Sequence, residues 1–126
     1  MTEEQADTAV LYEKAMGATV WLLGRVASFP KDQRYIVGRR MTDVILEFDE
    51  KLVRAWRAGR KERILEDLAA LLDQIRFYLR LSVEMKFISP SQFEYGSELC
   101  RDLGRLIGGW TRRDRQARMP VWEGDR

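Results

Sequence analysis

The chain has 126 residues, of which 45% are hydrophobic and 33% are charged, and its formal net charge is only +2. This length and mixture suit one folded domain, and any attraction for a polyanion has to come from local clusters of basic residues. The sequence contains no histidine, one cysteine, no Walker-type phosphate loop and no dinucleotide fingerprint, which excludes Cys/His and Ser/His catalysis and the usual zinc, iron and haem sites. We therefore expect no enzyme, no cofactor, no metal and no small-molecule substrate.

Apolar residues recur at three- and four-residue steps through nearly the whole chain, which predicts amphipathic helices and no strand. The first predicted helix covers residues 7–28 and ends before Pro30, because a proline disfavours the helical conformation of the residue before it. The second covers residues 32–58, after which Gly59 supplies a cap. Their predicted core faces are Tyr12, Met16, Val20, Leu23 and Ala27, followed by Gly38, Met41, Ile45, Phe48, Leu52 and Trp56.

The third predicted helix covers residues 60–87, and its core positions alternate in steps of three and four, as in near-parallel bundle packing. Ser89, Pro90 and Gln92 then form a capping-box pattern with proline at the first helical position, which starts a fourth helix over residues 90–113. The predicted core positions are Leu65, Leu68, Leu72, Ile75 and Leu79 in the third helix and Tyr95, Leu99, Leu103, Leu106 and Trp110 in the fourth.

Short connections force neighbouring helices to run antiparallel. The sequence therefore predicts an all-α fold, an up-down-up-down four-helix bundle over residues 1–113. After Arg113 the apolar pattern dissolves, and residues 114–126 are predicted to be a flexible basic C-terminal tail. Residues 1–9 are polar and acidic, and no apolar run approaches the roughly 20 residues that cross a bilayer. With the lone Cys100, this predicts a cytoplasmic protein that does not enter membranes.

The third helix carries apolar residues outside its core stripe, at Phe77, Leu81 and Ile88. A helix in a monomeric bundle needs only one apolar face, so these three residues are candidates for an oligomer interface. The alternative is that they are scattered surface hydrophobics, which are common on soluble proteins.

Arginine residues gather on particular faces of the predicted helices. Arg76 and Arg80 flank the core stripe of the third helix, where they can contact phosphates or carboxylates, or instead form an exposed ladder with Asp73 and Glu84. Further candidates for binding a polyanion are Arg57, Arg60, Lys61 and Arg63 around the turn after the second helix, and Arg105, Arg112 and Arg113, which continue from Arg101 on the fourth.

Two segments resemble a known family. Residues 28–40, which contain Phe-Pro-Lys, Arg-Tyr and Gly-Arg-Arg, resemble the opening of the second helix in a broad family of small four-helix bundles. That family includes the proteins encoded in intervening sequences of bacterial 23S ribosomal RNA genes and the accessory variability determinant (Avd) proteins of diversity-generating retroelements. Residues 75–81, with two arginines among aromatic and apolar residues, and the Gly-Gly-Trp of residues 104–110 resemble the Avd branch.

The resemblance implies a non-catalytic accessory protein that assembles as a closed homo-oligomer, a five-fold barrel. It further implies that the basic surfaces bind the reverse transcriptase of the element and its template RNA, alone or as an RNA/DNA hybrid, during mutagenic retrohoming. Two other interpretations stay open: an intervening-sequence bundle protein of unknown role, and a purely structural oligomeric adaptor.

Overall fold

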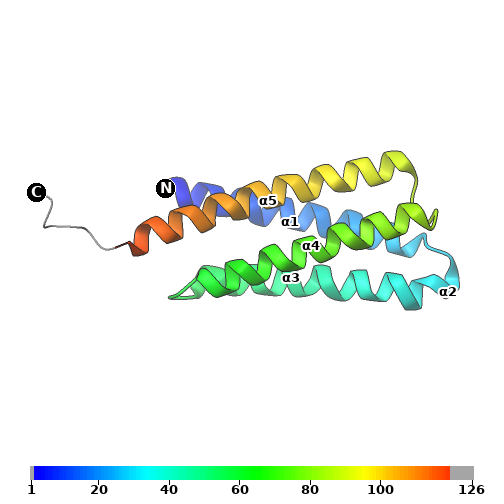
Figure 1. Cartoon of the computed structure of the whole chain (residues 1–126), viewed down its shortest axis with the longest axis horizontal. Coiled ribbons are helices and arrows are strands. Elements are labelled where there is room, and N and C mark those ends of the chain that lie inside the picture. The colour runs from blue at the N-terminus through cyan, green and yellow to red at the C-terminus, as the bar shows by residue number, and fades with distance from the viewer. Residues whose placement is uncertain (1, 120–126) are drawn as a thin grey trace, which may run out of the picture.

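The computed structural model describes residues 2–119, which form four long antiparallel helices lying side by side (Figure 1). Helix α1 spans Glu3–Ala27, α3 spans Arg39–Arg57, α4 spans Glu62–Glu84 and α5 spans Pro90–Arg118. Each helix packs against two others, so that α1 and α4 lie diagonally across the bundle and α3 and α5 fill the other two corners. The described residues contain no strand, and the predicted all-α, up-down-up-down four-helix bundle is confirmed.

The second predicted helix consists of three consecutive segments that together form one rod. A single turn, α2 (Lys31–Gln33), is followed by a π-helical segment, η1 (Arg34–Gly38), which runs directly into α3. Figure 1 places α2 at the end of the bundle where α4 connects to α5. None of the described helices is long and apolar enough to cross a membrane.

Reciprocal side-chain caps fix the starts of two helices. The predicted capping box at α5 is confirmed, because the Gln92 backbone N–H donates to Ser89 Oγ at 3.1 Å and the Ser89 N–H donates to Gln92 Oε1 at 2.9 Å. A second capping box, between Thr2 and Gln5, starts α1 at Glu3 rather than at the predicted residue 7. Each box satisfies backbone donors that a helix start would otherwise leave unpaired.

Helix α4 ends three residues earlier than the sequence predicted. Lys86 adopts a positive φ of 62°, and the Phe87 N–H donates to the Ser82 carbonyl at 2.8 Å, which closes the helix end. The turn directs Ile88 into the core, where its exposed fraction is 5%. The prediction that Ile88 belongs to an oligomer interface is therefore wrong for this residue.

The core confirms the predicted stripe of α4 completely and that of α3 except at Trp56, which is half exposed. The predicted face of α1 is wrong. Its large side chains are exposed, and the core instead takes the neighbouring face, which contains Leu11, Ala15, Ala18 and Leu22. The alanines allow α1 to approach the other helices closely. In α5, Leu103 and Trp110 are buried as predicted, whereas Tyr95 is half exposed and Cys100 and Ile107 complete the core.

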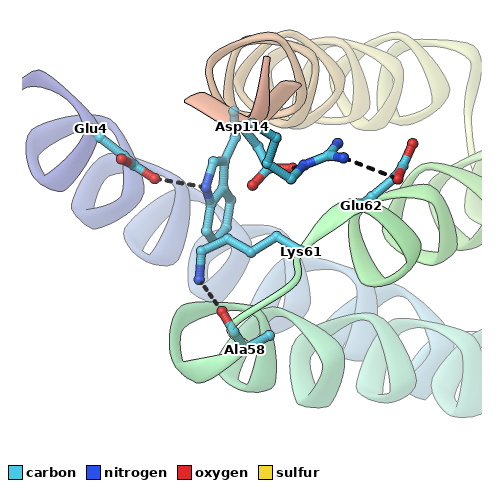
Figure 2. A network of polar contacts seen from close by, with 7 residues as sticks. Glu4, Ala58, Lys61, Glu62 and Asp114 are labelled. Atoms are coloured by element: carbon cyan, nitrogen blue, oxygen red, sulfur yellow. Dashed lines mark hydrogen bonds and ion pairs between the residues drawn. The ribbon is translucent and has the colours of Figure 1, made fainter. Parts of the chain in front are cut away.

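The fourth helix continues past the predicted start of the C-terminal tail. Arg118, in the last turn of α5, forms ion pairs with Asp114 at 3.0 Å and with Glu62 at the start of α4 at 3.2 Å. Figure 2 shows Asp114 and Glu62 from these two elements close together. Residues 114–118 are therefore helical rather than part of a tail, and residues 120–126 of the predicted tail lie outside the described residues.

Candidate functional site

An arginine-lined cleft of about 590 Å³ lies between α4 and α5. Glycines and apolar side chains form its floor, and four arginines and one carboxylate line it, which gives these five charged groups a net charge of +3. A concave basic surface of this kind attracts anions more strongly than the same charges on a convex surface. The lining residues are Ala69, Leu72, Asp73 and Arg76 from α4 and Arg101, Gly104, Arg105, Ile107, Gly108, Thr111 and Arg112 from α5.

Arg76 is held in a defined position across the cleft. One of its nitrogens, Nη1, pairs with Asp73 at 3.0 Å on its own helix, and Nη2 donates to the Cys100 carbonyl of α5 at 3.2 Å. Gly104 makes this arrangement possible, because a Cβ at that position would lie 2.8 Å from Nη2. The side chain is 45% exposed. The guanidinium is thus ordered by contacts on both helices while part of it faces the solvent.

Three arginines of α5 recur at helical spacing along the other side of the cleft. Arg105 contacts Asp102 at 3.4 Å, and Asp102 is shared with Lys14 of α1 at the same distance. Among residues 2–119, no carboxylate lies within ion-pair distance of Arg101 or Arg112. Weakly paired or unpaired guanidinium groups retain donors for an incoming phosphate or carboxylate.

Arg80 lies outside the cleft. It pairs with Glu84 at 2.8 Å in a largely exposed i,i+4 pair. The contacts of Arg76 and Arg80 with Asp73 and Glu84 are those of the predicted ladder, and exposed pairs of this kind contribute only about 0.2–1 kcal/mol to stability. The two arginines therefore differ in their contacts, since Arg76 contacts α5 and lines the cleft and Arg80 does neither.

Lys61 is engaged inside the bundle end rather than presented to solvent. Its Nζ donates to the carbonyls of Ala55 at 2.7 Å and Ala58 at 2.8 Å, and it lies 5.8 Å from the ring centre of Trp110. Figure 2 shows Lys61 reaching toward Ala58. These contacts satisfy the C-terminal carbonyls of α3, which otherwise lack helical partners. They favour a structural role for Lys61. The other predicted residues of this cluster, Arg57, Arg60 and Arg63, are exposed near the same turn.

Arg113 also has a structural contact. It pairs with Asp7 of α1 at 3.0 Å, its side chain is 27% exposed, and its Nε atom is buried without a partner among the described residues. Nearby, Trp110 is fully buried and its Nε1–H donates to Glu4 at 3.0 Å, a contact that Figure 2 displays. Both contacts fasten α5 to α1. Of the predicted binding residues, the structure thus brings Arg76, Arg105 and Arg112 together in one cleft.

A second surface, an apolar face across α1 and α3, was not predicted from the sequence. Tyr12 stacks on Trp56 with ring centres 5.9 Å apart, and both side chains are partly exposed. The large exposed apolar side chains of this face are Tyr12, Met16, Val20 and Leu23 from α1 and Leu46, Val53 and Trp56 from α3. Monomeric proteins rarely expose contiguous apolar patches of more than a few hundred Å². By contrast, Phe77 is exposed on α4 and Leu81 is half buried.

Asp49 is the acidic residue in a small pocket of this apolar face, about 90 Å³ in volume. Its Oδ2 accepts a hydrogen bond from Thr19 Oγ1 at 2.6 Å, whereas its Oδ1 is buried without a partner among the described residues. Burial raises the pKa of the Asp49 carboxyl to about 6, an effect that the Thr19 hydrogen bond opposes. A carboxyl with an unsatisfied buried oxygen destabilises the isolated chain.

Cys100, whose carbonyl accepts the hydrogen bond from Arg76, has a buried side chain. Burial raises the pKa of its thiol to about 11, and the nearby charge of Arg76 opposes this shift only in part. The thiol is therefore protonated at neutral pH and is a poor nucleophile. Among residues 2–119, no group of histidine, cysteine, aspartate and glutamate side chains has an arrangement that could hold a metal ion.

Comparison with curated proteins gives no match for this chain. Comparison with protein families matches residues 9–113 to the family described as bAvd-like, a segment that contains the cleft and most of all four helices. This match confirms the resemblance to Avd proteins that residues 75–81 and 104–110 carry, and the chain belongs to the bAvd-like family.

Proposed function

We propose that this chain is a non-catalytic accessory protein of a diversity-generating retroelement, and that it binds the reverse transcriptase and the template RNA of the element through its basic surfaces. Membership in the bAvd-like family supports the accessory role. The observation that supports nucleic-acid binding most directly is the cleft in which Arg76, Arg101, Arg105 and Arg112 lie around an apolar floor. We place this activity in the cytoplasm, where a lone thiol such as Cys100 stays reduced.

The cleft suits a phosphate backbone better than a base sequence. Guanidinium groups on two helices give several charge-assisted donors over a short distance, and such contacts bind phosphates with little discrimination among bases. The proposal therefore predicts RNA binding that weakens steeply as salt rises, because each neutralised phosphate releases counterions.

In this proposal the chain acts as a closed homo-oligomer, and the family resemblance points to a pentamer. The apolar face of α1 and α3 supports self-association more strongly than the predicted Phe77 and Leu81 do, because it is two helices wide and contains seven large exposed apolar side chains. A closed ring would cover this face on every subunit without open-ended growth.

RNA affinity, measured by fluorescence anisotropy at low and at moderate salt, tests the proposed role of the cleft. The Arg101→Gln/Arg105→Gln double variant should bind template RNA about tenfold more weakly than the wild-type chain, a difference of about 1.4 kcal/mol. Arg54→Gln/Arg115→Gln is the matched control, because it removes the same number of charges and both arginines are exposed and do not line the cleft. If the cleft variant and the control lose affinity for the RNA equally, overall charge rather than the cleft sets the affinity.

The apolar face also favours a second function, that of a structural adaptor without a nucleic-acid partner. The two functions differ in their salt dependence, because apolar contacts between proteins respond weakly to salt whereas phosphate contacts respond strongly. A chain that binds the reverse transcriptase but no RNA, at any salt concentration, would support the adaptor.

A further inference from the structure

The π-helical segment η1 exposes two large apolar side chains side by side. Tyr35 is 75% exposed and Ile36 is 60% exposed, and Tyr35 is the most exposed of the large hydrophobic residues that the structure describes. Burial of apolar surface stabilises a fold, so neither side chain contributes much to the bundle in this position. A role in contacting something outside the described residues accounts better for their exposure.

Basic residues flank these two side chains in the sequence. Lys31, Arg34, Arg39 and Arg40 are exposed within ten residues of sequence that contain one acid, Asp32, so the segment has a net charge of +3. The next acid along the chain is Asp43, one turn beyond Arg39. Within residues 2–119, none of these four cations lies within ion-pair distance of a carboxylate. The segment thus combines an exposed ring with several donors that have no charged partner.

The backbone around Tyr35 is held by close packing on both sides. Gly38 approaches α1 so closely that a Cβ at this position would lie 2.8 Å from Val26 Cγ1. Phe29, which precedes the segment, is 2% exposed and packs on Phe87 with ring centres 5.2 Å apart. A π-helical turn is rare and is found frequently at functional sites. The ring of Tyr35 is therefore presented on a fixed support, which lowers the entropy cost of binding.

We propose that η1 is a binding site for single-stranded nucleic acid, in which the ring of Tyr35 stacks on an unpaired base while Arg39 and Arg40 contact the flanking phosphates. Exposed aromatic rings beside unpaired cations are the features that sequence-tolerant single-strand binders use. A duplex is a poorer ligand because its bases are already stacked on one another. This inference rests on the proposed function and adds to it a second contact, because none of these residues lines the cleft between α4 and α5.

The experiment measures the affinity of the full chain for a fluorescein-labelled oligouridine RNA of about 12 nucleotides, a length within the site sizes of known single-strand binders. Tyr35→Ala should bind this RNA about tenfold more weakly, since stacking contributes about 1–3 kcal/mol for each base. Tyr35→Phe keeps the ring and should bind as the wild-type chain does. Phe77→Ala is the matched control, because Phe77 is 66% exposed on α4 and lies outside both sites.

Further measurements separate stacking from charge. Tyr35→Ala should leave the slope of log affinity against log salt unchanged, whereas Arg39→Gln/Arg40→Gln should reduce it by about 1.4, or about 0.7 for each lost contact to a single strand. An RNA substituted with 4-thiouridine should form a photo-crosslink that mass spectrometry locates at Tyr35. Oligothymidine of the same length reports whether DNA serves equally well, and a duplex RNA of the same length should bind the wild-type chain and Tyr35→Ala equally.

The results distinguish this inference from the proposed function. If the wild-type chain binds the oligouridine and Tyr35→Ala binds it equally well, the stacking site is wrong, while RNA binding by the cleft stands. If Tyr35→Ala and Tyr35→Phe lose affinity for the oligouridine equally, the ring does not stack on a base and the inference is also wrong. If the wild-type chain binds no single strand at low salt, the stacking site and the proposed RNA binding are both wrong.

Discussion

Arg76 of α4 rests on Gly104 of α5, and its Nη2 atom would lie only 2.8 Å from a Cβ at that position. This contact places the guanidinium within reach of the Cys100 carbonyl, 3.2 Å away, and keeps it at the edge of the cleft. The absence of a side chain at residue 104 therefore has a consequence for binding as well as for packing.

Gly104→Ala should weaken RNA binding without lowering stability. The added methyl displaces the end of a flexible side chain, which costs little, and alanine is favoured over glycine in a helix by about 1 kcal/mol. The affinity for template RNA should fall several-fold because Arg76 leaves its position, and circular dichroism should show an unchanged or higher melting temperature. Gly17→Ala is the control, since a Cβ there meets nothing within 4 Å; it should stabilise the chain and leave the affinity unchanged.

Arg76→Ala and Arg80→Ala should differ in their effect on binding to the reverse transcriptase and RNA. Arg76 contacts both helices of the cleft, whereas Arg80 forms only a local pair with Glu84. The expected loss is about tenfold for Arg76→Ala, or about 1.4 kcal/mol, and less than about twofold for Arg80→Ala. Both variants should keep the helicity and oligomer size of the wild-type chain in circular dichroism and native mass spectrometry. Dissociation of either would instead mark its arginine as structural.

Lys61→Met should destabilise the bundle by about 1–2 kcal/mol. The substitution keeps an apolar stem but removes the donors to the Ala55 and Ala58 carbonyls, and each unsatisfied group costs free energy. Urea denaturation should show a lower midpoint at an unchanged slope. Arg60→Met is the control, because Arg60 is exposed next to the same turn and should tolerate the change. An unchanged midpoint for Lys61→Met would contradict the structural role of Lys61.

The sequence predicted the core best in α4, where leucine and isoleucine recur in one regular stripe. In α4, charged residues such as Glu66, Asp67 and Asp73 interrupt the surface around Leu65 and Leu72, and the stripe is buried as expected. In α1 two neighbouring faces are apolar, so periodicity alone could not tell which one enters the core. The small side chains of Ala15 and Ala18 were the available signal, because they permit close helix packing.

The sequence predicted several arginines of the candidate site but not that they lie together in one cleft. Helical spacing places Arg105 and Arg112 on one side of α5, but their position opposite Arg76 depends on how α4 and α5 are aligned. That alignment follows from contacts such as the one at Gly104, which a single sequence does not reveal. Sequence reasoning also could not foresee that Lys61 is bound to backbone carbonyls, because those acceptors come from the end of another helix.

Asp49→Asn should stabilise the chain at neutral pH. The folded pKa of the Asp49 carboxyl, about 6, lies above its ordinary value of 3.8, so the folded chain binds the proton more tightly. The contribution of this proton to the free energy of unfolding is fully present below about pH 3.8 and is lost as the pH rises through about 6. Above that pH, ionisation of Asp49 no longer changes the stability. Thermal melts of Asp49→Asn should lose this pH dependence and show a melting temperature a few degrees higher at pH 7. Asp43→Asn, at an exposed position of α3, is the control. A lower melting temperature for Asp49→Asn at pH 7 would contradict the destabilising role of the charge.

Binding of RNA by the arginine-lined cleft is tested by the affinity of the purified chain for the template RNA in complex with reverse transcriptase. This affinity is measured as a function of salt for the wild type and for Arg76→Gln/Arg101→Gln/Arg105→Gln. This triple variant should keep its helicity, bind the complex at least about tenfold more weakly, and have a salt slope lower by about 2, or about 0.7 for each of the three lost phosphate contacts. A folded triple variant that binds the complex with wild-type affinity and wild-type salt slope would contradict RNA binding by the cleft.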